Sequence, residues 1–320
     1  MREKLKAGYY LLQKILGRER RLLAHIKAER LVTVLNLHQV SPRANAFWPP
    51  LEPRLFDDLL GYLKDHFEIV TFGELDATDG TLPRAVLSFD DGYYNFVEYA
   101  APLLDKHGLR ANMNVIPSCV ETGEPIWNVR LYDFLDAAPK ALIDELRLPG
   151  FEARLAGDDA SSKARYGLAI SRFLKNRPRG ERAALLTEIE PIMARLDFVP
   201  TRMMNAEEVL EMAVAGHEIG VHSYSHESME FEDERFFADD LEKCCRFFAE
   251  RLRLPLDIYA FPNGSCRAEQ IEFLKKEGFA HVLLVGEDYA RPPFRVCPRF
   301  TIYGASRLET RFQGLGINRR

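Results

Sequence analysis

The sequence predicts an α/β fold built around a parallel sheet or barrel. The first observation is an alternation of short apolar strands with amphipathic helices, which is the pattern of βαβ units. The second is that a chain of 320 residues, 47% of them hydrophobic, has ample material for a large buried core. The third is that polar motifs directly follow three of the predicted strands, where parallel sheets and barrels place their active sites.

Residues 1–30 are predicted to form a long amphipathic helix or a pair of helices. Leu5, Tyr9, Leu12 and Leu16 recur there at helical spacing. The segment holds nine Lys or Arg and three Asp or Glu, a local net charge of +6, whereas the whole chain has a net charge of −5. A basic amphipathic segment can contact a membrane surface. The alternative is a solvated helix packed on the main domain.

The main domain is predicted to span residues 31–320. Its first elements are a strand over 31–35, a proline-rich loop over 41–53, a helix over 54–66, a strand over 85–89, a helix over 93–107 and a strand over 110–116. Helical patterns without a strong strand then indicate an insertion at about 128–200. The alternation resumes with a helix from Asn205, a strand over 217–221, a helix over 233–252, a strand over 256–261, a helix over 267–277 and a strand over 279–285.

The bulk composition argues against several classes of protein. A net charge of −5 does not indicate a nucleic-acid binder, which usually has a basic excess. The five cysteines include no C-x-x-C pair, which favours a reduced, intracellular set. The chain shows neither a signal-peptide pattern nor a run of about 20 apolar residues. We therefore expect a cytoplasmic protein whose only membrane contact is peripheral, and the pattern predicts no particular oligomeric state.

The first polar motif is Ser88-Phe89-Asp90-Asp91-Gly92, at the end of the strand predicted over 85–89. Two adjacent carboxylates are costly unless a positive group lies beside them. A sharp turn at Gly92 would bring both carboxylates to one mouth, where one binds a metal ion while the other acts as a base. A surface Asp-Asp-Gly turn is the alternative that this motif leaves open by itself.

The second motif is His222-Ser223-Tyr224-Ser225-His226, after the strand predicted over 217–221. Histidines four residues apart lie on one face if the stretch makes a helical turn, as in other zinc motifs. With an Asp as third ligand they would form a site with open positions for water, which is typical of catalytic metal. The alternative is one core histidine and one exposed histidine.

The third motif is Ala260-Phe261-Pro262-Asn263-Gly264, at the end of the strand predicted over 256–261. A turn of this kind can aim a backbone N–H into a cavity, where the N–H is a candidate donor to an oxyanion. Pro-Asn-Gly is also a standard surface turn, so the motif only supports the other two.

Together the three motifs resemble those of the polysaccharide deacetylase family, the NodB-homology carbohydrate esterases. The stretch 88–92 resembles Thr-Phe-Asp-Asp-Gly, 222–226 resembles His-Ser/Thr-x-x-His, and 260–264 resembles a degraded Arg-x-Pro-Tyr-Gly. The motifs come in the family's order and span most of residues 31–300. His38 followed by a proline-rich loop resembles members associated with exopolysaccharide biosynthesis.

The resemblance implies a distorted (β/α) barrel with fewer than eight strands. It implies that Asp91, His222 and His226 bind a divalent metal, Zn²⁺ first and Co²⁺ or Ni²⁺ as alternatives. It also implies that Asp90 is the general base for a metal-bound water that attacks an acetamide carbonyl. The metal and the backbone N–H of Asn263 would then hold the developing oxyanion.

The chain departs from the family pattern at two places. The Arg of the third motif is Ala260 here, and the C-terminal Leu-x-His motif is not recognisable. His38 is a candidate for the general acid, with a structural role as the alternative, and Arg299 is a candidate for the missing Arg. Trp48, Pro262 and Arg299 are expected to contact the substrate, although core packing is an equal alternative for the tryptophan.

These features predict a hydrolase that removes acetyl groups from an N-acetylated amino sugar in a polysaccharide or its precursor. One alternative is hydrolysis of a cyclic amide at the same site. Another is a catalytically decayed carbohydrate-binding scaffold, which the lost Arg and the missing C-terminal His would explain. The absence of G-x-S-x-G and of G-x-x-x-x-G-K-[ST] disfavours serine esterases and nucleotide-dependent enzymes.

Overall fold

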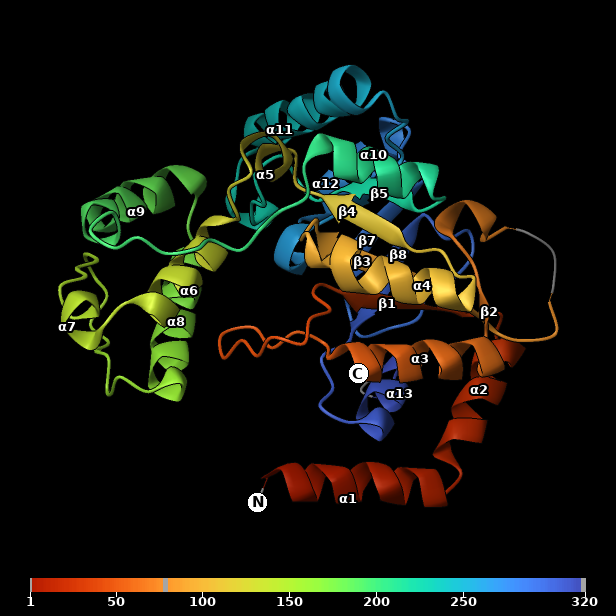
Figure 1. Ribbon diagram of the computed structural model, residues 1–320. Helices are drawn as coiled ribbons and strands as arrows, with labels where there is room; N and C mark the ends of the chain where they lie inside the picture. Colours follow the sequence, from red (N-terminus) through yellow and green to blue (C-terminus); the bar gives the residue numbers. More distant parts are fainter. Residues whose placement is uncertain (1, 77–79, 318–320) are drawn as a thin grey trace.

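The computed structural model describes residues 2–76 and 80–317, and within them seven parallel strands close into a barrel (Figure 1). Closure arises because β1 pairs with both β3 and β8. The ring consists of β1 (Val32–Leu37), β3 (Arg84–Asp91), β4 (Asn112–Val115), β5 (Glu218–Val221), β6 (Ile258–Ala260), β7 (His281–Val285) and β8 (Val296–Thr301). A further two-residue strand, β2 (Glu68–Ile69), pairs with β3 beside the ring. The predicted barrel with fewer than eight strands is confirmed.

The interior of the barrel is divided into an apolar end and a polar end. Side chains alternate along each strand, so every second residue points inward. Near the strand starts the inward residues are apolar, as Val34 and Val86 are, and they belong to one buried cluster. Toward the strand ends the inward positions are polar, as Asn36, Ser88 and Asn114 are, and all three are buried. This polar end is where a site with charged groups can be assembled.

Helices surround the barrel, largely as the sequence pattern predicts. They are α3 (Pro53–His66), α4 (Ala101–His107), α5 (Pro117–Thr122), α10 (Ala206–Val214), α11 (Glu234–Phe247), α12 (Ala268–Lys276) and α13 (Arg307–Gly314). The helix predicted from Asn205 is α10, and Asn205 and Glu208 form a capping box at its start. The helix predicted over 93–107 begins instead with a π-helical turn at Phe96–Ala100. The short elements β2 and α5 and the C-terminal helix α13 lie outside the prediction.

The insertion forms a helical unit with its own small core. Its helices are α6 (Trp127–Ala137), α7 (Lys140–Ile143), α8 (Ala160–Lys175) and α9 (Arg179–Met193), and Figure 1 shows them grouped at one side of the barrel. Leu131, Phe134, Ile170 and Leu174 are fully or almost fully buried in a cluster distinct from the main core. The insertion therefore has its own packing and meets the barrel along one edge.

The N-terminal segment is a pair of helices, α1 (Arg2–Ile15) and α2 (Arg18–Ala28). Gly17 separates them with a φ of 65°, a left-handed conformation that suits glycine. Leu22 and Ile26 of α2 are buried in the main core, whereas α1 contributes only Tyr10 to it among the described side chains. Among the helices of the described residues, none has the length and apolar character needed to span a membrane.

Candidate active site

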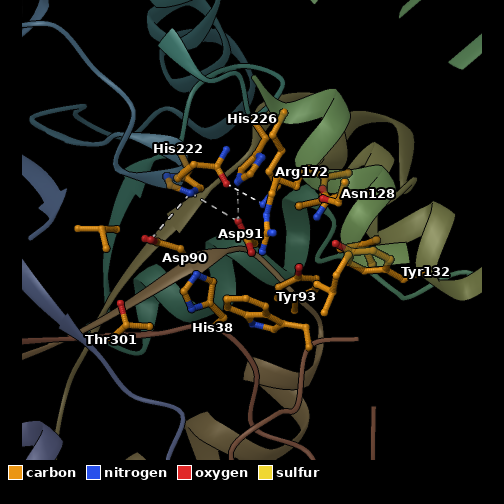
Figure 2. A pocket seen from close by; sticks show the side chains of 18 of the residues that line it. His38, Asp90, Asp91, Tyr93, Asn128, Tyr132, Arg172, His222, His226 and Thr301 are labelled. Atoms are coloured by element: carbon orange, nitrogen blue, oxygen red, sulfur yellow. Dashed lines mark hydrogen bonds and ion pairs between the residues drawn. The ribbon is translucent and has the colours of Figure 1, made fainter. Parts of the chain in front are cut away.

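The predicted metal ligands meet at the polar end of the barrel (Figure 2). One potential ligand atom from each of Asp91, His222 and His226 lies within 4.8 Å of the other two. The Nε2 atoms of His222 and His226 lie 3.6 Å and 3.4 Å from Oδ1 of Asp91. All three residues are buried. Three side chains from two strand ends are thus gathered around one point.

The first motif turns at the end of β3 as its sequence predicts. Asp90 lies at an inward position of the strand and is 1% exposed. Asp91 and Gly92 then have φ values of 77° and 76°, so the backbone bends sharply at these two residues. Because of this bend both carboxylates reach the same mouth, although neighbours in a regular strand would point to opposite sides.

The two histidines of the second motif lie close together as predicted, but the backbone between them differs from the prediction. The stretch is not a helical turn: it is a loop in which Ser223 and His226 both have a φ of 60°. Asp240 of α11 holds the loop, since it accepts hydrogen bonds from the Ser223 hydroxyl at 3.2 Å and from the Tyr224 N–H at 3.1 Å. The expected helical turn is therefore wrong, and side-chain hydrogen bonding replaces it.

The protonation of the site suits a divalent cation. The Nδ1 atom of His222 lies 2.8 Å from the carbonyl oxygen of Ala260, so an Nδ1–H donor leaves the Nε2 lone pair facing Asp91. Burial lowers the pKa of His222 and lowers that of His226 well below its usual value, which keeps both imidazoles neutral. Burial also raises the pKa of Asp91. A cation would remove the cost of burying that carboxylate as an anion.

The surroundings of the Asp91 carboxylate also suit a divalent cation. Tyr93 donates a hydrogen bond from its hydroxyl to the Asp91 carboxylate. Oδ1, the oxygen nearest to both histidines, is buried and has no hydrogen-bond partner among the residues described. Buried polar atoms without partners are rare because they lose their hydration without compensation. The donor set of one carboxylate and two imidazoles fits Zn²⁺ and similar ions.

Asp90 is held by an arginine from the far end of the chain. Arg299 donates from Nη1 to Oδ1 at 2.8 Å and from Nη2 to Oδ2 at 2.7 Å, and Asn114 donates to Oδ1 at 2.8 Å. Burial alone raises the pKa of Asp90, but the nearby charges and hydrogen bonds, chiefly those of Arg299, outweigh it and hold the pKa well below its usual value. Arg299, the candidate for the arginine that the third motif lacks, thus forms a two-point ion pair with Asp90.

Two residues that were predicted to contact the substrate do not line the pocket above the site. Arg299 has no exposed surface, and its guanidinium is engaged by Asp90 and by the hydroxyl of Ser88. Pro262 is buried in the turn that follows β6. Contact of either residue with a substrate stays a prediction.

The pocket has a volume of about 420 Å³ and is bordered by both the barrel and the insertion. From the barrel side come Asn36, His38, Trp48, Asn263 and Thr301. His38 and Trp48 lie edge to face, with ring centroids 5.5 Å apart, and the indole is 42% exposed. Burial lowers the pKa of His38, while Asp91 and then Asp90 oppose this effect. An aromatic wall beside a histidine is therefore open to a ligand.

Asn263, which the sequence suggests as an oxyanion donor, borders the pocket in a left-handed conformation with a φ of 58°. Its side chain bridges two parts of the site. Nδ2 donates to the Ser228 hydroxyl at 3.0 Å, and Oδ1 accepts a hydrogen bond from Nζ of Lys175 at 2.9 Å. Lys175 belongs to α8, so this hydrogen bond joins the third motif to the insertion.

Sequence reasoning missed the contribution of the insertion and two supports of the carboxylates. The insertion residues that line the pocket are Asn128, Val129, Tyr132, Leu168, Ser171, Arg172, Lys175 and Asn176. Figure 2 shows Asn128 and Tyr132 across the metal ligands from Asp90. Asn114 was detectable in principle, because Asn112 and Asn114 alternate with apolar residues inside a strand and so mark a polar inner face. Tyr93 carries no such signal.

A buried ion pair also links the insertion to the histidine loop. Glu227 directly follows His226 and forms an ion pair with Arg182 of α9, both residues being almost fully buried. Nε of Arg179 lies 3.3 Å from the other oxygen of Glu227. The guanidinium of Arg182 also lies over the ring of Trp127, 5.5 Å from its centroid. The position of the loop over residues 222–226 is thus coupled to the packing of the insertion.

Comparison with known proteins agrees with the fold and with the motifs. Residues 190–282, which contain the second and third motifs, match the model of the family described as polysaccharide deacetylase. No curated protein sequence matches the chain.

Three solved structures share the architecture. The Streptococcus pyogenes deacetylase PplD, determined with acetate, is 16% identical with a TM-score of 0.57, covering 89% of this chain and 98% of its own. IcaB from Ammonifex degensii is 18% identical with a TM-score of 0.56, covering 89% and 97%. The BpsB deacetylase domain from Bordetella bronchiseptica is 15% identical with a TM-score of 0.52, covering 85% and 96%. At these identities the structures establish the common fold. With the family match they confirm the predicted resemblance to polysaccharide deacetylases.

Proposed function

We propose that the protein is a metal-dependent deacetylase that hydrolyses the acetamide of an N-acetylated amino sugar in a polysaccharide or its precursor. The observation that carries the proposal is that two adjacent carboxylates have different surroundings. Asp91 presents an unpartnered buried oxygen to two neutral imidazoles, whereas the adjacent Asp90 is held ionised by Arg299. The family match and the shared fold support the same class of hydrolase.

Asp91, His222 and His226 would hold the divalent cation, with Zn²⁺ as the first choice and Co²⁺ or Ni²⁺ as alternatives. When bound, such a cation lowers the pKa of water and polarises a carbonyl oxygen. The chain's own contribution is to keep the two imidazoles neutral and to fix the position of all three donors. The Ala260 carbonyl orients His222, and the Tyr93 hydroxyl orients Asp91.

Asp90 is the general base in this proposal. Oδ2 lies 3.8 Å from Nε2 of His222, so the carboxylate borders the place where a nucleophilic water would stand. Because Arg299 keeps it ionised, Asp90 can accept a proton from that water over the whole neutral range. Arg299 and Asn114 occupy Oδ1, and they fix the direction in which Oδ2 faces.

The remaining two roles fall to two residues that line the pocket from the barrel side. The backbone N–H of Asn263 is the oxyanion donor in this proposal, since its turn borders the pocket. His38 would protonate the leaving nitrogen, because it follows β1 and lines the pocket beside both Asp residues. Trp48 would stack on a sugar ring with its exposed face.

The test is acetate release from N-acetylglucosamine oligomers by the purified protein, before and after metal removal with a chelator. We expect activity that is lost on chelation and restored by Zn²⁺, Co²⁺ or Ni²⁺, with no comparable turnover of cyclic amides. Cyclic-amide hydrolysis without acetate release would assign the site to the other carbon–nitrogen bond. A protein that binds none of these ions would contradict the proposal and favour a decayed scaffold.

A further inference from the structure

Two cations of the insertion face the pocket without a carboxylate partner. Leu168, Ser171, Arg172 and Lys175 lie at spacings of three and four residues along α8, so one face of this helix borders the pocket. Lys175 donates to the neutral side-chain oxygen of Asn263. For Arg172 the described part of the chain offers no ion pair, hydrogen bond or ring contact.

Several other basic residues of the insertion have partners in the protein. Arg130 pairs with Glu190 and Arg195 with Glu145 inside the insertion, and Arg182 pairs with Glu227 of the histidine loop. On α8 itself, Arg165 donates to the hydroxyls of Ser161 and Ser162. Among the cations of the described insertion, Arg172 is the one that both borders the pocket and has no partner.

The charges that border the pocket do not balance. In the described structure, the carboxylates among its lining residues are Asp90 and Asp91. Asp90 is already neutralised by Arg299, and Asp91 is the ligand for a cation. Arg172 and Lys175 form no ion pair with a carboxylate in the described structure, so both are available to a negatively charged ligand. Burial lowers the pKa of Lys175, and the charge of Asp91 opposes this effect.

From this geometry we infer that the substrate carries an anionic group, a carboxylate or a phosphate, next to the N-acetylated sugar. Arg172 and Lys175 are the residues that recognise it. The fork of donors on a guanidinium matches the oxygens of a carboxylate or phosphate, and a partly enclosed ammonium adds a second charge-assisted hydrogen bond. The inference rests on the proposed deacetylase function and adds the substrate class.

The experiment compares a neutral N-acetylglucosamine disaccharide with two acidic ligands. One is the disaccharide of N-acetylglucosamine with a uronic acid, and the other is UDP-N-acetylglucosamine. Binding is measured by titration calorimetry in the presence of a chelator, where no turnover occurs, and kcat/KM is measured on the metal-loaded protein. We expect at least one acidic ligand to bind about tenfold more tightly than the neutral one, with the preference falling as salt is added.

Variants identify the residues responsible. Arg172→Gln should reduce the acidic-to-neutral ratio of kcat/KM about tenfold, mainly through KM, and Lys175→Gln should reduce it as well. Arg165→Gln removes the same charge from the same helix away from the pocket and should leave the ratio unchanged. A preference for the uronic acid indicates a neighbouring residue of a polymer, whereas a preference for the diphosphate indicates an activated precursor.

Two results would overturn the inference. One is deacetylation of neutral and acidic substrates with equal kcat/KM, and the other is an equal effect of Arg172→Gln and Arg165→Gln. Failure of the proposed function has a different signature, since no N-acetylated sugar of either kind would then release acetate.

An independent observation concerns the face of α1 that points away from the body. Leu5, Tyr9, Leu12 and Leu16 form a stripe at helical spacing, and their exposed fractions are 68%, 47%, 51% and 56%. Leu11 and Ile15 widen the stripe, with exposed fractions of 51% and 72%. Contiguous exposed apolar surface of this kind marks an interaction site.

The opposite side of α1 fixes how this stripe is presented. The ring of Tyr10 stacks on Phe312 of α13 with centroids 5.9 Å apart, and Lys6 pairs with Glu309. Figure 1 shows α1 at the periphery, beyond α13 and away from the strands. Among the described residues, the apolar stripe therefore faces outward rather than into the core.

The net charge of the N-terminal segment indicates which kind of partner fits the apolar stripe. Residues 1–30 carry nine Lys or Arg and three Asp or Glu, a net charge of +6. A second copy of the chain would bring an equal positive charge to the contact, whereas an anionic lipid surface would complement it. We propose that α1 lies in the plane of an anionic bilayer surface with its apolar stripe inserted at the headgroup boundary.

Co-sedimentation of the full chain with vesicles tests this second proposal. We expect binding to vesicles of phosphatidylcholine and phosphatidylglycerol that is at least fivefold above binding to phosphatidylcholine alone. Leu5→Gln/Leu12→Gln should abolish it, whereas Val199→Gln/Val214→Gln, at two other highly exposed apolar positions, should not. Absence of vesicle binding, or a dimer in solution that Leu12→Gln dissociates, would overturn the proposal.

Discussion

The barrel and the insertion both border the pocket, but they carry their charges differently. At the barrel end, Asp90 and Arg299 are at most 1% exposed and paired through two hydrogen bonds. On the insertion side, Arg172 is exposed, borders the pocket and has no ion-pair partner among the described residues. Buried charges are costly unless their partners are fixed, whereas exposed charges remain available to a ligand. Under the proposed function, the barrel carries out bond cleavage and the insertion selects the substrate.

The largest expected effects concern the barrel residues. His226→Ala should lose the bound metal and all acetate release, because it removes one of three ligands. Asp90→Asn should keep the metal and lower kcat by about 10²- to 10⁴-fold, the usual contribution of a general base. Metal content by elemental analysis and acetate release measure the two effects, with His66→Ala on α3 as a control that retains both. Metal loss in Asp90→Asn would show that this carboxylate is a ligand.

Arginine–carboxylate pairs of the two regions should differ in their contribution to stability. Arg299→Met leaves Asp90 buried without its counter-charge and should cost about 3–5 kcal/mol of unfolding free energy. Arg130→Met breaks the exposed pair with Glu190 and should cost about 1 kcal/mol or less. Urea unfolding of both variants gives the comparison. Equal losses would contradict the expected difference between the buried ion pair of the barrel and the exposed ion pair of the insertion.

The ion pair between Arg182 and Glu227 links the insertion to the proposed metal site, so its loss should lower the affinity for the metal. Arg182→Met leaves Glu227 buried beside His226 without its main partner, and we expect metal affinity to fall by about 10- to 100-fold. Arg195→Met breaks an exposed pair within the insertion and serves as the matched control. Competition with a chromogenic chelator measures the affinity. An unchanged affinity would mean that the loop is positioned by the barrel alone.

The smallest expected effect concerns the pH-dependent contribution of Asp57, on the outside of the barrel, to the stability of the fold. Hydrogen bonds from Lys106 and His107 lower the pKa of Asp57 below its usual value. A depressed pKa stabilises the fold above the unfolded-state pKa, and this stabilisation disappears as pH falls through the folded-state pKa. Asp57→Asn should therefore destabilise the protein by less than about 1 kcal/mol at pH 7. The difference from wild type should shrink below about pH 4. Thermal melts across pH, with Asp65→Asn on the same helix as control, test this.

Much of the barrel could be predicted because its signals are local. Strands β1 and β3 are continuous buried runs, and the residues that follow them carry the recognisable motifs. Asp91, His222 and His226 come together because parallel strand ends share one edge of the barrel. The prediction of a closed barrel depended on the family resemblance, because the alternation of strands and helices also fits an open sheet.

Contacts between distant segments could not be predicted in the same way. Arg299 meets Asp90 across 209 positions of sequence, and Lys175 meets Asn263 across 88. The sequence shows that these residues are polar, but it does not show which residue forms the ion pair or hydrogen bond with each of them. The left-handed backbone at Ser223 and His226 was likewise hidden, because neither residue is a glycine and Asp240 of another helix holds the turn.

Closure of the ring between β1 and β8 has a consequence for synthesis on the ribosome. Asp90 is translated 209 residues before Arg299, the cation that neutralises it. At about 5 to 20 residues per second, the nascent chain waits roughly 10 to 40 s for that partner. Until then, burying Asp90 as an anion is unfavourable, so the barrel stays open and its apolar strand edges stay uncovered. The salt bridge that keeps Asp90 ionised therefore forms only after β8 has been synthesised.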